Sequence, residues 1–148
     1  MPPRIGRIAE TPASAWTPTI KAELFAGRRE APLAKAVGLT QFGVNHLTLA
    51  PSSISSLRHW HEGEDEFVLV LSGEVALVDG DGEHALSPGD YAGFPAGEAN
   101  GHHLVNRGTA QAVCIVVGTR KVGEETIHYP DDGIGPFTVV RDARGERT

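Results

Sequence analysis

Residues 58–73, RHWHEGEDEFVLVLSG, hold two histidines, a nearby glutamate and an apolar run that ends in Ser-Gly. In an extended chain, residues i and i+2 point to the same side, so His59 and His61 can face one point while Trp60 faces away. Imidazole and carboxylate groups both bind borderline divalent metals, and Glu66 follows five residues after His61. The stretch therefore predicts three ligands of a metal site on a strand hairpin, with a fourth ligand from elsewhere in the chain.

The other cluster of histidines is His102-His103, about forty residues further along the chain. Strand alternation lets only one of these two side chains point inward. Neutral imidazoles combined with a carboxylate suit Mn, Fe, Co, Ni, Cu or Zn. A thiolate site is excluded because no cysteine lies near either cluster.

Short apolar runs separated by turn signals fill the middle of the chain. The sequence DGDG at 79–82 predicts a tight hairpin, and SPGD at 87–90 predicts another turn. Short strands at this spacing, with no long helical pattern between them, are typical of an all-β sandwich or barrel. Because segments 67–71 and 113–117 are apolar at every position, we expect both faces of these strands to be covered. The N-terminal arm or a second copy in a homodimer would supply that cover.

The length of 148 residues fits one domain. We expect an N-terminal arm at 1–38, a barrel core at 39–120 and a C-terminal extension at 121–148. Trp16 is the residue expected to anchor the arm, and residues 21–37 predict no more than a short helix. The polar residues 141–148 are expected to fray.

Charge and composition disfavour several classes of partner. The net charge is −6 and no basic run is present, so nucleic acid and anionic membranes are not expected partners. No apolar run approaches the ~20 residues of a membrane span. The first residues lack the apolar segment of a signal peptide, and the lone Cys114 reads as a small buried hydrophobe. These features favour a cytoplasmic protein.

The histidine stretch resembles the first motif of the cupins, which is a glycine, five residues, His-x-His, three or four residues, Glu, six residues and Gly. Here His59-x-His61 is followed by four residues, Glu66, six residues and Gly73, and Ser53 stands at the leading glycine position.

The later histidines resemble the second cupin motif, which is Gly, five residues, Pro-x-Gly, two residues, His, three residues and Asn. The corresponding residues are Gly89, Pro95, Gly97, His102 and Asn106, with two more residues between Gly97 and His102 than the pattern has.

The resemblance covers about residues 40–120 and points to small single-domain bacterial cupins of largely unassigned function. It implies a double-stranded β-helix, or jelly-roll, barrel of six to eight strands that holds a small-molecule ligand. It also implies one divalent transition metal held by a set of four side chains. That set is His59, His61, Glu66 and one later histidine, for which the motif spacing favours His102 over its alternative, His103.

Such a site predicts a metalloenzyme that acts on a small oxygenated or sugar-like molecule, as an isomerase, decarboxylase or dioxygenase. The alternative is a small-ligand-binding or sensor cupin without catalysis. His46 and Tyr91 are the candidates for a general base. Three acidic residues near the histidines are expected to form a solvated turn, and three arginines could bind an anionic substrate. These are Glu62, Glu64 and Asp65, and Arg58, Arg107 and Arg120.

Overall fold

The structure is a computed structural model that describes residues 2–15 and 18–148. Trp16, the expected anchor of the arm, lies outside the described residues. A short helix, α1 (Leu33–Ala36), follows the first strand. The strands are β1 (Arg28–Pro32), β2 (Phe42–Leu49), β3 (Trp60–His61), β4 (Glu66–Ser72), β5 (Val75–Asp79), β6 (Gly82–Leu86), β7 (Tyr91–Phe94), β8 (His103–Val105), β9 (Ala112–Thr119), β10 (Gly123–Tyr129) and β11 (Ile134–Arg141).

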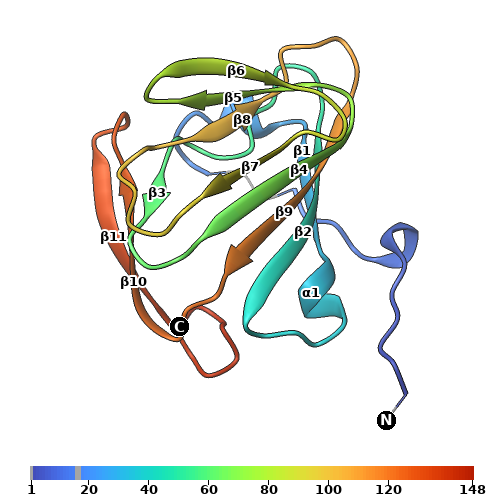
Figure 1. The fold of residues 1–148 in the computed structure, drawn as a ribbon, viewed down its shortest axis with the longest axis vertical. Helices are drawn as coiled ribbons and strands as arrows, with labels where there is room; N and C mark the ends of the chain where they lie inside the picture. Colours follow the sequence, from blue (N-terminus) through green and yellow to red (C-terminus); the bar gives the residue numbers. More distant parts are fainter. Residues whose placement is uncertain (1, 16–17) are drawn as a thin grey trace.

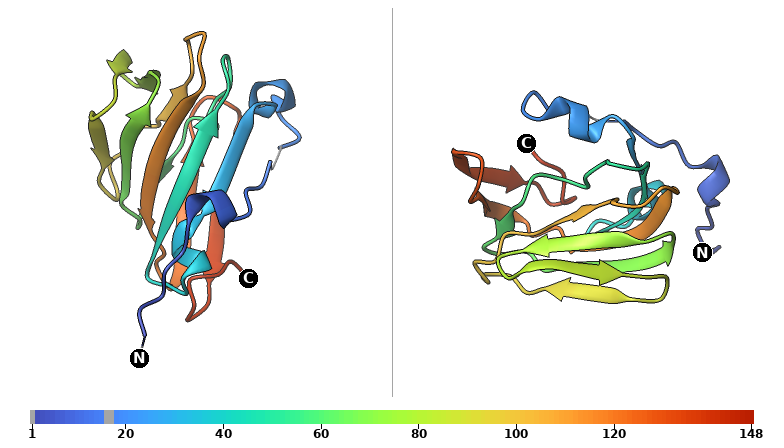
Figure 2. Two further views of the ribbon diagram at one scale, coloured as in Figure 1. Left: turned by 90° about the vertical axis from the view of Figure 1, so that its right-hand side faces the viewer. Right: turned by 90° about the horizontal axis from the view of Figure 1, so that it is seen from above.

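The strands form three antiparallel sheets, which confirms the all-β prediction. The largest has the order β1-β2-β9-β4-β7, and the two smaller ones have the orders β11-β10-β3 and β6-β5-β8. Figure 1 shows the large sheet in the centre, with β5, β6 and β8 above it and the β10–β11 hairpin to one side. Viewed from two further directions, the sheets enclose a common interior (Figure 2), as in a jelly-roll barrel.

The core lies inside this barrel, where alternate residues of the large sheet meet those of β5 and β8. Val70, Cys114 and Leu47 occupy one row across three strands, and all three are at most 1% exposed. Leu77 and Leu104 pack against them from the opposite sheet. Because neighbouring residues on one face contact each other across the strands, this register sends Glu66 to the same interior.

The outer face of the large sheet is apolar and partly exposed. Phe67 is 37% exposed, Leu71 is 44% exposed and Tyr91 is 69% exposed. The N-terminal segment contacts the other end of the sheet, where Ser14 bridges Glu30 of β1. The expected cover over β4 is therefore not supplied by the described residues of the arm.

Two parts of the chain differ from the sequence predictions. Residues 28–32 form an edge strand, β1, in a region where no more than a short helix was expected. The C-terminal extension forms the β10–β11 hairpin, and β10 pairs with β3. The expectation that residues 141–148 fray is wrong, because Arg147 bridges Arg141 in an antiparallel pairing. Within the described residues, no helix has the length and apolar character needed to span a bilayer.

Candidate metal centre

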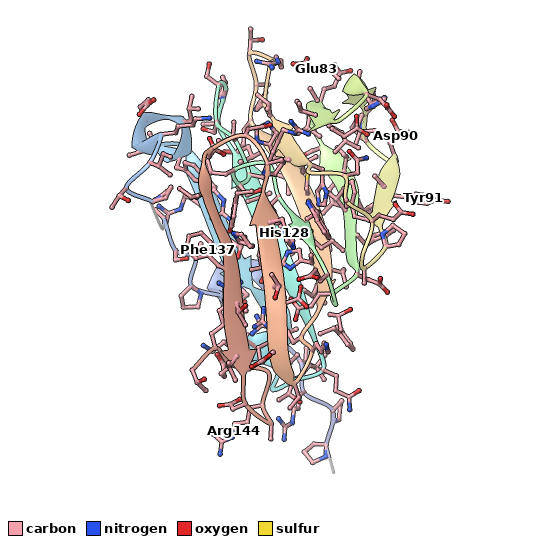
Figure 3. All side chains as sticks on the ribbon, turned by 90° about the vertical axis from the view of Figure 1, so that its left-hand side faces the viewer. Glu83, Asp90, Tyr91, His128, Phe137 and Arg144 are labelled. Carbon is pink, nitrogen blue, oxygen red and sulfur yellow. The ribbon has the colours of Figure 1, made fainter. Side chains whose placement is uncertain are left out.

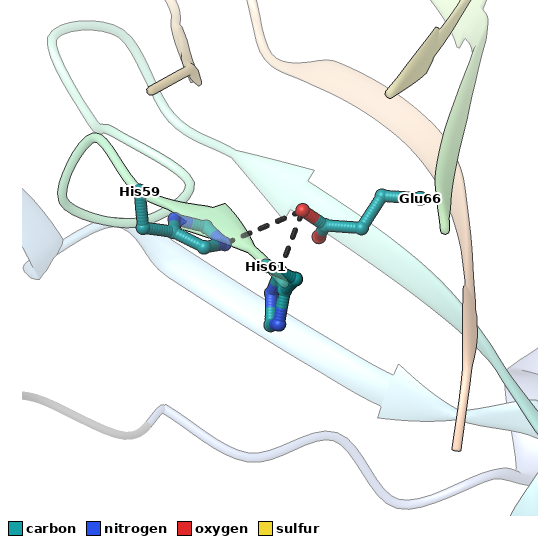
Figure 4. Close-up of side chains that lie close together, drawn as sticks. All are labelled: His59, His61 and Glu66. Carbon is teal, nitrogen blue, oxygen red and sulfur yellow. Dashed lines mark ion pairs between the residues drawn. The ribbon is translucent and has the colours of Figure 1, made fainter. Parts of the chain in front are cut away.

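Two strands, β3 and β4, and the residues just before β3 and β8 bring the histidines and the glutamate together. His61 lies on β3, and His59 lies just before it in a bridge with His102. The backbone amides of His59 and His102 donate to each other's carbonyl oxygens, over 3.3 and 3.0 Å. Because directly opposed residues point to the same side of a sheet, both rings face the interior beside His61. Glu66, the first residue of β4, faces His59 and His61 from the large sheet (Figure 4).

Glu66 Oε1 is the centre of this cluster. It lies 3.5 Å from His59 Nε2, 3.5 Å from His61 Nε2 and 2.9 Å from His102 Nε2. The structure therefore brings together all four residues that the sequence singled out. His103 is placed differently, because its Nδ1 lies 2.7 Å from the backbone oxygen of Ser56. It lines the same cavity but does not join the cluster around Glu66.

The opposite ring nitrogen of each clustered histidine already has an oxygen partner. His59 Nδ1 lies 2.8 Å from the Leu57 carbonyl, and His102 Nδ1 lies 3.0 Å from the Asn100 carbonyl. Carbonyl oxygens only accept, so both Nδ1 atoms carry the proton and donate. In the neutral rings, each Nε2 then presents a lone pair toward the Glu66 carboxylate. Lone pairs that converge in this way need a cation between them, either a proton or a metal ion.

The pKa values of the cluster reflect this competition. Burial alone would lower the pKa of His59, but the hydrogen bond and negative charge of Glu66 outweigh it and raise the pKa above 6.5. Burial lowers the pKa of His61 to about 4. When a proton lies between the rings and Glu66, hydrogen bonds from Nε2 of His102 and His59 hold the pKa of Glu66 well below its usual range, although burial alone would raise it. Glu66 is therefore ionised at neutral pH.

Buried polar side chains at the C-terminal hairpin pack behind His61. Glu125 of β10 is 2% exposed, and its Oε1 lies 3.2 Å from His61 Nδ1. Burial and the nearby charge of Glu64 raise the pKa of Glu125. Glu64 is 4% exposed and accepts from Arg141 Nε over 3.0 Å. The expectation that Glu64 belongs to a solvated turn is wrong, because the unforeseen hairpin covers it.

The longer loop of the second motif helps to orient His102. Its residue Asn100 provides the carbonyl that accepts from His102 Nδ1, while the Asn100 side chain accepts from the Gly80 amide over 2.9 Å. The ring of Phe94 stacks on the His102 ring, with centroids 3.6 Å apart and an interplanar angle of 5°. These contacts fix the ring from its edge and from its face.

Asn106 fixes a turn through its side-chain hydrogen bonds. It is fully buried, and its Nδ2 donates to the carbonyls of Leu49 and Ala110 over 2.9 Å each. Its Oδ1 accepts from the Gly108 amide over 2.9 Å. Asn106 therefore joins the end of β8 to the loop before β9, outside the histidine cluster.

The candidate general bases lie away from the cluster. His46 of β2 is aligned with Ile115 of β9 and Leu69 of β4, which is in turn opposite Tyr91. This row alternates with the row that carries the core, so it lies on the outer face of the sheet. Figure 3 shows Tyr91 projecting away from the barrel. The structure thus does not bring His46 or Tyr91 to the histidines.

The cluster opens into a cavity of about 270 Å³, which suits a small molecule. Of the three arginines considered from sequence, only Arg120 is among the described residues that line it. Arg58 instead pairs with Asp131 over 2.6 Å, and Arg107 pairs with Glu83.

Comparisons with known proteins agree with this geometry. The family described as "Cupin domain" matches residues 45–118, which include all four clustered side chains. A solved structure from Silicibacter pomeroyi, described as a sugar phosphate isomerase from a cupin superfamily, is 42% identical, with a TM-score of 0.79. The match covers 96% of this chain and 90% of that one. This chain belongs to the cupin superfamily.

Other cupins share the architecture at lower identity. A protein from Acidithiobacillus ferrooxidans with the same sugar phosphate isomerase label is 32% identical, with a TM-score of 0.69 and coverage of 82% of this chain and 74% of that one. The polyketide cyclase RemF from Streptomyces resistomycificus is 24% identical, with a TM-score of 0.63 and 80% coverage of both chains, so it shares only the fold. No curated protein matches the sequence significantly.

Sequence reasoning missed the part of this cupin site that comes from the C-terminal hairpin. Glu125 and Ile127 are both buried, whereas the side chains on either side of Glu125 are more accessible. That alternation is visible only in the structure, because Glu124-Glu125-Thr126-Ile127 does not alternate between polar and apolar residues. The partner of that strand, β3, has only two residues and gives no signal of its own.

Proposed function

We propose that this cupin is a metalloenzyme that holds one divalent transition metal through Nε2 of three histidines and a carboxylate oxygen. The ligands are His59, His61, Glu66 and His102. The supporting observation is the convergence of their lone pairs, because the Nδ1 atoms of His59 and His102 are committed to backbone carbonyls. Imidazole and carboxylate donors suit Fe, Mn, Zn, Ni, Co or Cu.

A metal bound in this way would act as a Lewis acid toward a substrate oxygen, which serves isomerisation, decarboxylation or dioxygenation of a small oxygenated or sugar-like molecule. The protein's own part is to hold the ligands in place. Glu125 and the two backbone carbonyls fix the ring orientations, as partners of ligating histidines commonly do. Phe94 and Val116 supply apolar wall to the cavity beside the cluster.

One observation favours the alternative of a non-catalytic small-ligand-binding cupin. The other carboxylates of the cavity wall are already engaged: Glu30 pairs with Arg28 over 2.6 Å, and Glu64 pairs with Arg141. Asp65 Oδ1 accepts from the Ala96 amide over 2.7 Å. None of these carboxylates is placed as an evident general base. Tight binding of a ligand without turnover would support this alternative.

Elemental analysis of protein purified without a histidine tag tests the proposal. We expect close to one transition metal per chain, and a metal-free protein that stays so after reconstitution would refute it. Oxygen uptake with a panel of small enols, diketones and phenols then separates dioxygenases from isomerases. A matched variant, His84→Ala, removes a histidine that pairs with Asp79 on a distant hairpin and should keep the metal.

We also infer a homodimer that buries the apolar outer face of the large sheet. The support is the exposure of Phe67, Leu71 and Tyr91 on one side of β4 and β7. Light scattering should give twice the chain mass. Leu71→Glu should shift the protein toward monomer, and a wild-type monomer at micromolar concentration would refute the inference.

A further inference from the structure

Among the described residues, four arginines line the cavity, and two of them are neutralised by carboxylates. Arg28 pairs with Glu30 over 2.6 Å, and Arg141 pairs with Glu64 over 3.0 Å. The remaining two, Arg120 and Arg147, form no ion pair with a carboxylate of the residues that the structure describes. The cavity therefore holds two uncompensated guanidinium groups beside the histidine cluster, in a chain whose net charge is −6.

Arg120 is held at the cavity by two glycines. It follows β9, and its backbone amide donates to the Gln41 carbonyl over 3.1 Å. Its guanidinium lies across Gly43 of β2, where an added Cβ would come within 3.1 Å of Arg120 Nε. Gly145, with φ of +75°, packs on the other part of the side chain, and a Cβ there would lie 3.0 Å from Arg120 Cβ. A larger side chain at either position would displace the arginine.

Arg147 reaches the cavity from the C-terminal tail. It forms an antiparallel bridge with Arg141, and directly opposed residues project to the same side. Since Arg141 points inward to Glu64, Arg147 is directed to the same cavity. The turn that reverses the chain is closed by the Gly145 amide, which donates to the Asp142 carbonyl over 2.9 Å. Arg147 and His59 both line this cavity.

The chemistry of these two groups selects an anion. Guanidinium presents a rigid fork of N–H donors that binds carboxylate and phosphate oxygens in pairs. A partly enclosed cavity strengthens such contacts, because the effective dielectric constant is lower than that of water. Two carboxylates of the cavity wall, Asp65 and Glu66, have no arginine partner in the described part of the chain. A divalent metal would balance their two negative charges, so Arg120 and Arg147 would leave the cavity as a whole positive.

We propose that Arg120 and Arg147 form an oxyanion subsite that holds the carboxylate or phosphate group of a small acidic substrate. The oxygenated carbons of the same molecule would then lie toward His59, His61, Glu66 and His102. The placement of the oxygenated carbons beside the histidines and Glu66 rests on the proposed function. The anion subsite itself depends only on the two arginines.

Calorimetric titration of the full-length protein with inorganic phosphate, and separately with malonate, tests the subsite. Arg120→Gln and Arg147→Gln should each weaken binding by about tenfold, because each removes a charge-assisted contact, and the double variant should weaken it by more. Tighter binding of phosphate than of malonate assigns a phosphate ester, and the reverse assigns a carboxylic acid. Binding of neither probe to the wild type overturns the proposal.

The control is Arg144→Gln, which removes an arginine of the same tail that projects outward (Figure 3) and does not line the cavity. It should bind both probes like the wild type. Equal losses in all three single variants would mean a general charge effect and would overturn the subsite. Arg120→Lys keeps the charge but lacks the fork, so it should bind more weakly than the wild type if the geometry of the fork matters.

Metal content separates this proposal from the preceding one. Both arginine variants should keep close to one metal per chain, because neither residue belongs to the ligand set. If the wild type lacks metal yet binds phosphate through the arginines, the metalloenzyme fails and the subsite stands. If the metal is present and the arginine variants bind both probes unchanged, the subsite fails.

Discussion

Replacing Glu125 tests whether the C-terminal hairpin controls the metal affinity of His61. Glu125 Oε1 lies 3.2 Å from His61 Nδ1, and the Glu125 side chain is almost fully buried. Glu125→Leu removes the oxygen that accepts from Nδ1, so the ring loses the contact that holds Nε2 toward Glu66. Glu125→Gln keeps an acceptor oxygen of the same reach and removes only the ionisable group.

The expected magnitude follows from the role of a partner behind a ligating histidine. Loss of such a partner lowers metal affinity by about ten- to a hundredfold, or roughly 1.4–2.7 kcal/mol. We therefore expect this loss for Glu125→Leu and a change of less than about threefold for Glu125→Gln. Because burial and the charge of Glu64 raise the pKa of Glu125, the site disfavours a negative charge at this position, and we expect the neutral amide to be tolerated.

Competition between the protein and a chromophoric chelator for Zn²⁺ or Co²⁺ provides the assay. Nitrogen chemical shifts of His61 would report its tautomer directly. Glu124→Gln is the matched control, since Glu124 is the exposed neighbour on β10 and should have no effect. Equal affinities for the Leu and Gln variants, with both folded by circular dichroism, would refute the reasoning.

Four further changes have defined outcomes. His61→Ala should lose the metal but keep a wild-type far-ultraviolet spectrum, because the apolar rows hold the core; an unfolded variant would make the metal structural. Metal affinity should be full above the raised pKa of His59 and fall at least about tenfold per pH unit below it, since the metal must displace the proton on His59. His61 has a pKa of about 4, so protons compete with the metal for this ring only in stronger acid. A pH-independent affinity between pH 5 and 7 would contradict histidine ligation. The Cys114 thiol, whose pKa burial raises to about 11, should react with a disulfide reagent at pH 8 only after unfolding in urea. Asn106→Ala should lower the free energy of unfolding in urea by about 2–4 kcal/mol, because it leaves two carbonyls and one amide without their partner. A loss below about 0.5 kcal/mol, which is typical of an exposed site, would contradict the role of Asn106 in fixing the turn.

The barrel and the clustered side chains were predictable because both depend on short-range patterns. Alternation along an extended strand puts His59 and His61 on one side, and the DGDG turn sets the β5–β6 hairpin. The same alternation allowed only one of His102 and His103 to face Glu66, and motif spacing favoured His102, which the structure places beside it.

The rest of the site was not predictable because it depends on contacts between distant segments. Glu64 reads as part of a wet acidic turn until Arg141, far along the chain, is known to cover it. β1 is an edge strand rich in charge that ends in Pro32, so it lacks the alternating apolar signal of a half-buried strand. His46 could not be assigned to a face because apolar residues occupy both alternating sets of β2.

The pairing of β10 with β3 makes the C-terminal hairpin a reporter of what happens at His61. Ile127 lies opposite His61, and the Glu62 amide donates to the Thr126 carbonyl over 3.0 Å. A ligand that binds only the closed arrangement lowers the population of locally opened states. Amide hydrogens of β10 and β11 should therefore exchange with solvent more slowly when a metal or ligand occupies the site at His61, while those of the distant β6 edge keep their rates. Occupancy of the barrel could then be read from the backbone of a hairpin that lies outside the family match.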